Sequence, residues 1–212
     1  MEVEGQPTEV ISYSEKDLET TLECASCNLR YAIYGLFANC PDCGSHNSLQ
    51  ILEKNLELAQ KLLGAFVGQS PEVAQSIHEA ALTQVVSAFD GFGREVTRQF
   101  DQHHGNGKPS VSSFQSIAKA RARTITAFRY DLADGILEEE WTSLCCLFQK
   151  RHLIAHRLGV VDDEYIEATT DPTAIVGRKV KISPEEIPNA ISVLLRVGTR
   201  MLCALEVLKS NK

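Results

Sequence analysis

From residue 49 onward, apolar residues recur every three or four positions, which is the period of an amphipathic helix. Five segments show this spacing: residues 51–66, 73–103, 112–128, 138–158 and 187–208. Polar stretches rich in glycine, proline and aspartate separate them and are typical of loops. The pattern therefore predicts an all-α fold over residues 51–212, a helical bundle of about five helices.

Several residues mark the expected ends of these helices. Ser70-Pro71 has the form of a serine N-cap followed by proline at the first helical position. Ser183-Pro184-Glu185-Glu186 has the form of a capping box. Gly159 is suitably placed to end the helix that begins near residue 138. Gly91 and Gly93 fall inside the longest helix, where we expect a bend.

The first fifty residues follow a different pattern. Residues 1–20 are polar and acidic, which predicts a flexible lead-in. Residues 21–48 contain two Cys-x2-Cys pairs, Cys24 with Cys27 and Cys40 with Cys43, separated by twelve residues. Two such turns place four thiolates around a tetrahedral Zn²⁺. The segment between them, residues 30–37, is rich in aromatic and aliphatic residues and suits short strands.

We therefore predict a small β zinc ribbon over residues 21–48, with one structural Zn²⁺ per chain bound by all four cysteines. Because every ligand comes from the protein, no coordination position is left for catalysis. Two other interpretations remain open. In the first, the four residues are unrelated buried cysteines. In the second, one of the two pairs has a redox role.

Charge and composition restrict the partners and the compartment. The net charge is −7, but the first fifty residues hold eight acidic and two basic side chains, so the remainder is nearly neutral. This balance argues against a broad, non-specific grip on nucleic acid, and any RNA contact has to be local. No apolar run approaches the roughly 18 residues that span a bilayer, and the acidic N-terminus has no signal-peptide core. We expect a soluble cytoplasmic protein without a membrane partner.

The helix predicted over residues 138–158 carries the most informative irregularity. Its apolar series Trp141, Leu144, Phe148, Ala155 and Leu158 leaves a gap where a core residue is due at position 151. Arg151 occupies that position, His152 lies beside it, and His156 follows one turn later. A permanent charge on the apolar face of a helix is costly unless it is paired or belongs to a binding or catalytic surface. We therefore take these three residues as the candidate site.

This segment also resembles a known family. Arg151 and His156 form an Arg-x4-His motif near the end of a helix, and the chain continues as RLGVVDDEY over residues 157–165. Both features resemble the HEPN superfamily, in its bacterial and phage-defence branch, and the resemblance covers roughly residues 51–209. Many members have Asn or Asp directly after the arginine, where this chain has His152.

The resemblance implies a helical bundle that forms a homodimer, with the two motifs facing each other across a cleft. Active members look like metal-independent endoribonucleases, often toxins with an antitoxin or antiviral effectors with a partner protein. The residue types fit RNA cleavage by the 2′-OH, because histidine moves protons near neutral pH and arginine holds a phosphate. On this basis His156 is the expected acid/base, Arg151 the phosphate clamp, and His152 an orienting or second ionisable group. The expected product is a 2′,3′-cyclic phosphate.

Other interpretations of the same residues stay open. His152 and His156 are spaced like half of a metal site, with Asp162 or Glu164 as further ligands. In a second interpretation, Arg151 forms a structural ion pair with a carboxylate, for example that of Asp162. In a third interpretation, the whole protein is not a nuclease but a non-catalytic dimeric adaptor that binds nucleic acid or protein.

Two other features of the helical region have both a structural and a functional interpretation. Tyr165 suits packing better than chemistry. The basic strip formed by Lys119, Arg121, Arg123 and Arg129 is either a solvated face or an edge that contacts phosphate.

Overall fold

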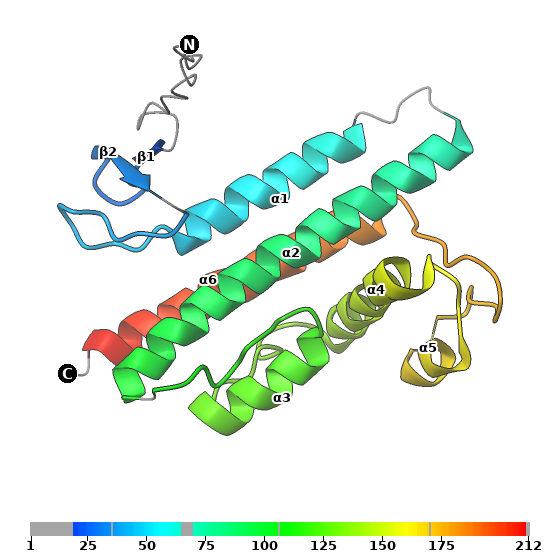
Figure 1. Ribbon diagram of the computed structural model, residues 1–212. Helices are drawn as coiled ribbons and strands as arrows, with labels where there is room; N and C mark the ends of the chain where they lie inside the picture. The colour runs from blue at the N-terminus through cyan, green and yellow to red at the C-terminus, as the bar shows by residue number, and fades with distance from the viewer. Residues whose placement is uncertain (1–18, 35, 65–69, 106, 170, 211–212) are drawn as a thin grey trace, which may run out of the picture. The chain divides into compact units, whose positions relative to one another are not determined.

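The computed structural model describes residues 19–34, 36–64, 70–105, 107–169 and 171–210, and Figure 1 shows them as a ribbon. The chain divides into two compact units, Met1–Asn47 and Ser48–Lys212. The acidic lead-in predicted over residues 1–20 lies outside the described residues up to position 18, and the first strand begins at Glu19.

The first unit contains a two-stranded antiparallel sheet. Strand β1 (Glu19–Glu23) pairs with strand β2 (Arg30–Tyr34), in a register that places Glu23 opposite Arg30. Arg30 Nε donates to Glu23 Oε2 at 2.8 Å across this last pair. The short hairpin therefore brackets the first Cys-x2-Cys turn, which lies between its two strands.

The second unit is built of helices, as the apolar pattern predicts. The described residues form six of them: α1 (Ser48–Gly64), α2 (Pro71–His104), α3 (Ile117–Phe128), α4 (Glu138–Arg157), α5 (Asp163–Ala168) and α6 (Glu186–Ser210). The predicted fold class, a helical bundle preceded by a small β segment, is confirmed. Within the described residues, no helix combines the length and apolarity needed to cross a membrane.

The predicted helix ends are also found. Ser70 caps α2, and its hydroxyl accepts a hydrogen bond from the Val73 amide at 3.4 Å. The Glu186 carboxylate accepts from the Ser183 amide at 2.6 Å, which is one half of the expected capping box. After α4, Leu158 and Gly159 both take left-handed conformations, and the Gly159 amide donates to the Leu153 carbonyl at 3.0 Å.

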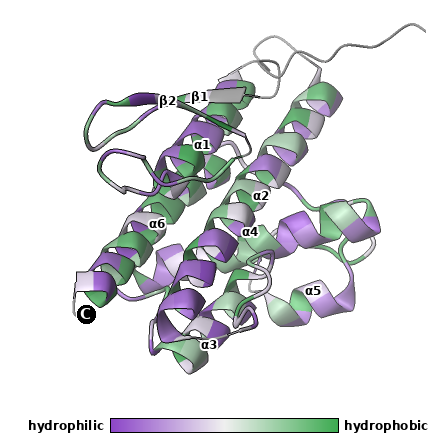
Figure 2. Ribbon diagram, turned by 60° about the vertical axis from the view of Figure 1, so that its left-hand side comes forward, coloured by the Kyte–Doolittle hydropathy of each residue, from purple (hydrophilic) through white to green (hydrophobic). Residues whose placement is uncertain are grey.

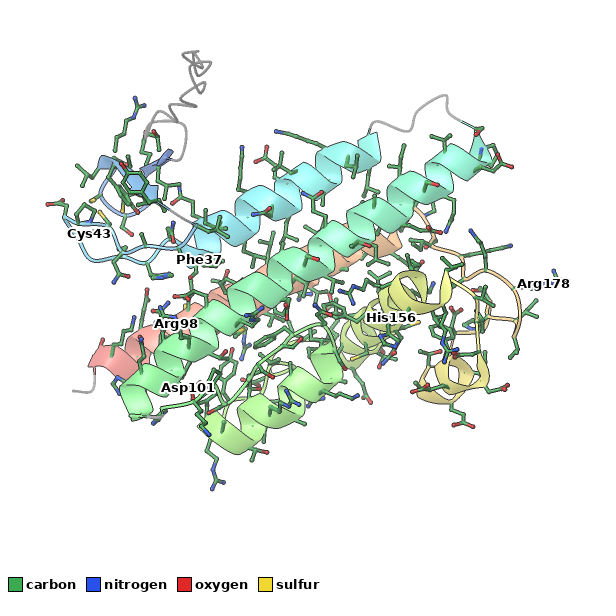
Figure 3. All side chains as sticks on the ribbon, viewed as in Figure 1. Phe37, Cys43, Arg98, Asp101, His156 and Arg178 are labelled. Atoms are coloured by element: carbon green, nitrogen blue, oxygen red, sulfur yellow. The ribbon has the colours of Figure 1, made fainter. Side chains whose placement is uncertain are left out.

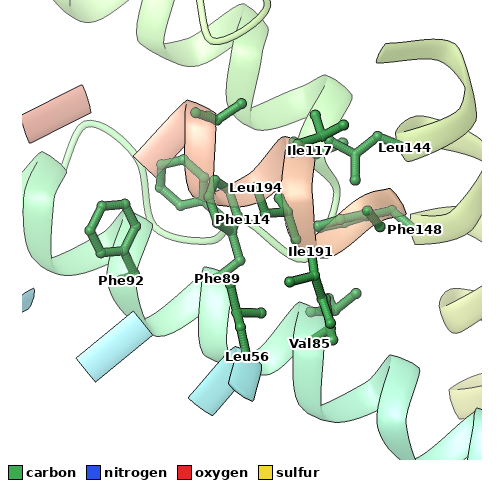
Figure 4. Close-up of a cluster of buried hydrophobic side chains, with 14 of the residues drawn as sticks. Leu56, Val85, Phe89, Phe92, Phe114, Ile117, Leu144, Phe148, Ile191 and Leu194 are labelled. Atoms are coloured by element: carbon green, nitrogen blue, oxygen red, sulfur yellow. The ribbon is translucent and has the colours of Figure 1, made fainter. Parts of the chain in front are cut away.

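The main core lies where α2 packs against α1, α4 and α6. Figure 4 shows its centre, where side chains from all four helices meet those of the segment that leads into α3. Phe89 and Phe114 pack edge to face, with ring centroids 5.9 Å apart. In Figure 2, α6 shows many hydrophobic residues and α3 many hydrophilic ones.

A second, smaller core lies beyond the end of α4. Leu153, Val161, Tyr165 and Val180 are all buried there. The chain segments on either side of α5 pair with each other: the Val161 amide donates to the Arg178 carbonyl at 2.9 Å, and the Val180 amide donates to the Gly159 carbonyl at 2.8 Å. This small core fixes α5 beside the C-terminal half of α4.

Helix α2 continues through Gly91 and Gly93 without a break, and the two glycines have different surroundings. A Cβ added at Gly93 would lie 2.6 Å from the ring of Phe114, which is completely buried. A Cβ added at Gly91 would meet no atom within 4 Å. Gly93 is therefore needed for the close approach of Phe114, the residue that anchors the segment leading into α3.

This contrast predicts opposite effects of the same substitution. We expect Gly93→Ala to lower the free energy of unfolding by about 1–3 kcal/mol, because the Phe114 ring has no space into which to move. Gly91→Ala should raise it by up to about 1 kcal/mol, because alanine favours the helix. Urea denaturation of both variants measures the difference. An equal gain in both would show that Phe114 does not pack on Gly93.

Candidate functional site

The four predicted cysteine ligands come together in the first unit. Their sulfur atoms all lie within 4.8 Å of one another, with Cys24 Sγ 3.5 Å from Cys43 Sγ and Cys27 Sγ 3.6 Å from Cys40 Sγ. Tetrahedral ligation at a metal–sulfur distance of about 2.3 Å requires sulfur atoms about 3.8 Å apart. The four thiols therefore fit a single tetrahedral metal ion.

The two cysteine turns share one backbone geometry. The Asn28 amide donates to the Cys24 carbonyl and the Gly44 amide donates to the Cys40 carbonyl, each at 2.9 Å. Asn28 and Gly44 both have a left-handed backbone, with φ of 59° and 73°. Glycine and asparagine are the residues that adopt this conformation most readily. Asn28 is therefore the counterpart, in the first turn, of Gly44 in the second.

One ligand is polarised by its neighbours. Hydrogen bonds with the side chain and the backbone of Ser45 lower the pKa of the Cys43 thiol to about 6. The Ser45 hydroxyl also lies 2.9 Å from that of Ser26, on the other cysteine turn. These contacts join the two turns around the cysteine cluster and favour the thiolate, the form that binds a metal.

In the second unit, Arg151 occupies the core position that the apolar pattern left for it. Its side chain lies between buried residues of α4 and is only 7% exposed. Within the described residues, no carboxylate pairs with it, and its buried Nε has no hydrogen-bond partner. Leaving a buried guanidinium nitrogen without a hydrogen-bond partner is costly. This unpaired charge is the most unusual feature of the helical unit.

Arg151 lines a cleft of about 490 Å³ between the start of α3, the C-terminal half of α4, and α5. Four basic and two acidic side chains contribute to its lining: Lys119, Arg123, Arg151, Arg157, Asp162 and Glu164. The local charge is therefore +2 with histidine neutral, in a chain whose net charge is −7. Such a cleft attracts anions.

The two histidines of the motif take different positions relative to this cleft. Both are exposed, and their ring centroids lie 4.6 Å apart on successive turns of α4. His152 lines the cleft together with Arg151, whereas His156 is not among the lining residues. Figure 3 shows His156 on the part of α4 that lies beside α5. A single chain thus directs Arg151 and His152 into one space and places His156 outside it.

Asp162 has other partners than those considered from the sequence. Its carboxylate caps α5 by accepting from the Tyr165 amide at 2.9 Å, and it lies 3.7 Å from Nε of Arg157. Within the described residues, the only group of three or more potential metal ligands is the cysteine cluster, so neither Asp162 nor Glu164 completes a site with the two histidines. The geometry therefore favours neither a histidine metal site nor an ion pair between Arg151 and Asp162.

The basic strip predicted on α3 divides between two environments. Arg121 forms a two-point ion pair with Asp131, at 2.6 and 2.8 Å, and its guanidinium lies 5.3 Å from the centre of the Trp141 ring. Lys119 and Arg123, one turn apart, face the cleft instead. Arg121 is thus a structural residue, while its two neighbours contribute charge to the candidate site.

Sequence reasoning missed a second buried cation directly beside Arg151. Lys150 is 4% exposed, and its Nζ lies 2.6 Å from Glu186 Oε1, 2.8 Å from the Lys181 carbonyl and 3.6 Å from Asp171 Oδ2. Tyr165 donates its hydroxyl proton to the same Asp171 oxygen at 2.8 Å. Tyr165 is therefore a packing residue that also holds a carboxylate in place.

The Lys150 network borders a second cavity, of about 570 Å³, between α4 and α6. Lys150, the cation in its lining, is neutralised by Glu186, and Glu140 pairs with Arg196 at 2.5 Å. The cation of this cavity is therefore paired, unlike Arg151 in the other cleft. The signal available in the sequence was the run of two basic residues, Lys150-Arg151, in an otherwise apolar helix.

We expect Lys150→Met to lower the free energy of unfolding by about 3–5 kcal/mol, because it leaves the buried Asp171 carboxylate and the partly buried Glu186 carboxylate without their cation. Lys61→Met removes an exposed ion pair with Glu57 and should cost no more than about 1 kcal/mol. Chemical denaturation of both variants compares the two positions. Equal losses would show that the Lys150 network contributes no more than a surface pair.

The same network predicts a dependence on pH. Burial raises the pKa of Asp171, but hydrogen bonds from Thr173 and Tyr165 and the charge of Lys150 outweigh it, so the pKa is lowered overall. A lowered pKa adds stability above the ordinary value near 4, and this contribution is lost as pH falls through the pKa of the folded state. The difference between wild type and Lys150→Met should therefore shrink below about pH 4.

For the cysteine cluster, we expect elemental analysis of the purified protein to find one metal ion per chain. Cys24→Ser should lose it, and Cys203→Ser, an exposed thiol outside the cluster, should keep it. The helical circular-dichroism signal should persist in both variants, because the helices belong to the other unit. A metal-free wild-type protein purified without chelators would contradict the assignment.

We also compared the chain with known proteins. No family model, no curated protein and no solved structure matches it.

Proposed function

We propose that this protein is a metal-independent endoribonuclease of the HEPN type. The observation that supports this most strongly is the unpaired, buried Arg151 at the wall of a cationic cleft. A buried guanidinium without a carboxylate is costly for folding alone, and it is useful when a phosphate completes its environment. Exposed His152 and His156 follow it on the same helix, one and five residues later, and supply groups that move protons.

The proposed reaction uses the nucleophile that RNA carries. His156 removes the proton of a ribose 2′-OH, the oxygen attacks the adjacent phosphorus, and the bond to the 5′-oxygen breaks. A second imidazole protonates the departing 5′-oxygen, which leaves a 2′,3′-cyclic phosphate and a 5′-hydroxyl. Arg151 stabilises the charge that grows on the phosphoryl oxygens. His152 orients the phosphate or serves as this second ionisable group.

A homodimer belongs to the proposal because one chain places His156 outside the cleft that holds Arg151. A two-fold axis beside α4 brings a second motif to the same cleft and doubles the available groups. In the cell we propose a cytoplasmic role in a toxin–antitoxin or antiviral system, regulated by a partner protein. The cysteine cluster, with four thiolate ligands, is best suited to a structural Zn²⁺ that takes no part in cleavage.

The position of His156 also favours a second candidate function. A single chain does not bring His156 into the cleft that holds Arg151. If the motif does not cleave RNA, the cationic cleft is still present and can bind an anionic partner. Such a protein is a dimeric adaptor that binds nucleic acid or protein without cutting it. Both candidates share the fold, so activity has to separate them.

We expect purified protein to cleave total RNA in the presence of EDTA, and Arg151→Ala and His156→Ala each to reduce the rate at least 100-fold. His152→Ala should have a smaller effect. Arg94→Ala, an exposed arginine on α2 outside the cleft, is the matched control and should cleave normally. Gel electrophoresis with end-group analysis measures the rate and identifies the cyclic phosphate.

Three results would speak against the nuclease. Intact RNA at high protein concentration, with the dimer confirmed by light scattering, favours the adaptor. Cleavage that requires an added divalent ion favours metal-dependent chemistry. Equal activity of all variants would identify a contaminating nuclease.

A further inference from the structure

The cleft has a wall that the Arg-x4-His motif does not describe, namely the N-terminal turn of α3. Residues 116–119 line the cleft together with Arg151. The N-cap residue Ser116 makes no side-chain capping hydrogen bond. The first amide that bonds within the helix is that of Ala120, which donates to the Ser116 carbonyl at 2.9 Å. In the described residues, the amides of Ile117, Ala118 and Lys119 therefore have no acceptor.

An uncapped helix start presents free amides and the positive end of the helix dipole, which together suit an anion. On its own this is a common feature of helices. Here a second observation supports it independently, because Arg151 is more than nine-tenths buried, has an unpartnered Nε and lines the same cleft from α4. Two neighbouring elements thus each leave hydrogen-bond donors unsatisfied toward one space.

The remaining charges agree with an anionic ligand. Lys119 and Arg123 stand on the α3 side of the cleft, and Arg123 Nη1 donates to the Ser112 hydroxyl at 3.2 Å. The two acidic lining residues belong to the α5 side, where Asp162 is already engaged as the cap of α5. No acidic residue lies in the first turn of α3. The α3 side of the cleft is therefore the side whose charges favour an anionic ligand.

We propose that the N-terminal turn of α3 and Arg151 together form a binding site for a phosphate group. The amides of residues 117–119 donate to the phosphate oxygens from one side, and the guanidinium donates from the other. Assigning this phosphate to the backbone of an RNA strand rests on the proposed function. The binding site itself does not depend on cleavage, so the two ideas can fail separately.

Ala118 allows a test that leaves the fold intact. It is exposed, it is the second residue of α3, and it lines the cleft. An aspartate at this position favours the helix through its dipole, so Ala118→Asp should fold at least as well as wild type. The same carboxylate competes with a phosphate for the free amides. Ala122→Asp, one turn later, exposed and outside the cleft lining, introduces the same charge as a matched control.

Binding is measured with a fluorescent 2′-O-methyl RNA oligonucleotide, which has no nucleophile and is not cleaved. We expect Ala118→Asp and Arg151→Met each to weaken binding at least tenfold, and Ala122→Asp to stay within twofold of wild type. Inorganic phosphate, compared with chloride at equal ionic strength, should raise the melting temperature of wild type and of Ala122→Asp. It should not do so for the other two variants. Without phosphate, Arg151→Met should melt no lower than wild type, because it removes an unpaired buried charge.

The outcomes separate the binding site from the nuclease. If RNA is never cleaved and the binding losses appear as expected, the phosphate site stands and the nuclease fails. If RNA is cleaved but Ala118→Asp binds and cleaves like Ala122→Asp, the α3 site is wrong while the nuclease stands. Stabilisation by inorganic phosphate without any binding of the oligonucleotide supports the site for a free phosphate and removes its assignment to RNA. Equal binding by all four proteins overturns the site.

Discussion

Two adjacent cations buried in one helix constrain the whole helical unit. Lys150 and Arg151 are each more than nine-tenths buried, and they point to different sides of α4 because consecutive helical residues differ by about 100°. Lys150 is neutralised by Glu186 and lies close to Asp171, whereas Arg151 has no acidic partner in the described part of the chain. One charge is therefore neutralised inside the helical unit, and the other is left without an acidic partner there.

The paired cation, Lys150, holds the segment after α4 in place, and this segment forms one wall of the Arg151 cleft. The Lys150 network joins α4 to the start of α6 and to Asp171, and Tyr165 extends it into α5. Buried ion pairs of this kind contribute little net stability, but breaking them is costly, so they favour one arrangement over its alternatives. Helix α5 is only six residues long and would not hold its place by its own contacts. The small core around Leu153 and Val180 and the Lys150 network together fix the α5 wall of the cleft.

The opposite wall is held by packing and by one buried carboxylate, because Asp90 Oδ1 accepts from the Phe114 amide at 2.5 Å. Phe114 is completely buried against Gly93 and Phe89, and it lies only three residues before Ile117, where α3 begins. The packing of the main core thus fixes the position of the α3 N-terminus. In the first unit, four cysteines lie close enough together to bind one metal ion, and such a metal would take the role that a hydrophobic core has elsewhere.

The sequence by itself determined the features that depend on neighbouring residues. Helical period identified the bundle, Ser70 and Glu186 marked helix starts, and the spacing of four cysteines indicated one metal site, because each of these patterns is a local geometric requirement. The gap in the apolar series also placed Arg151 at a buried position. Only the tertiary structure decided that Arg151 lacks a partner while Lys150 has one, and that the start of α3 faces the same cleft. Those facts join residues such as Lys150 and Glu186, which are 36 positions apart, and no local periodicity encodes a contact at that separation.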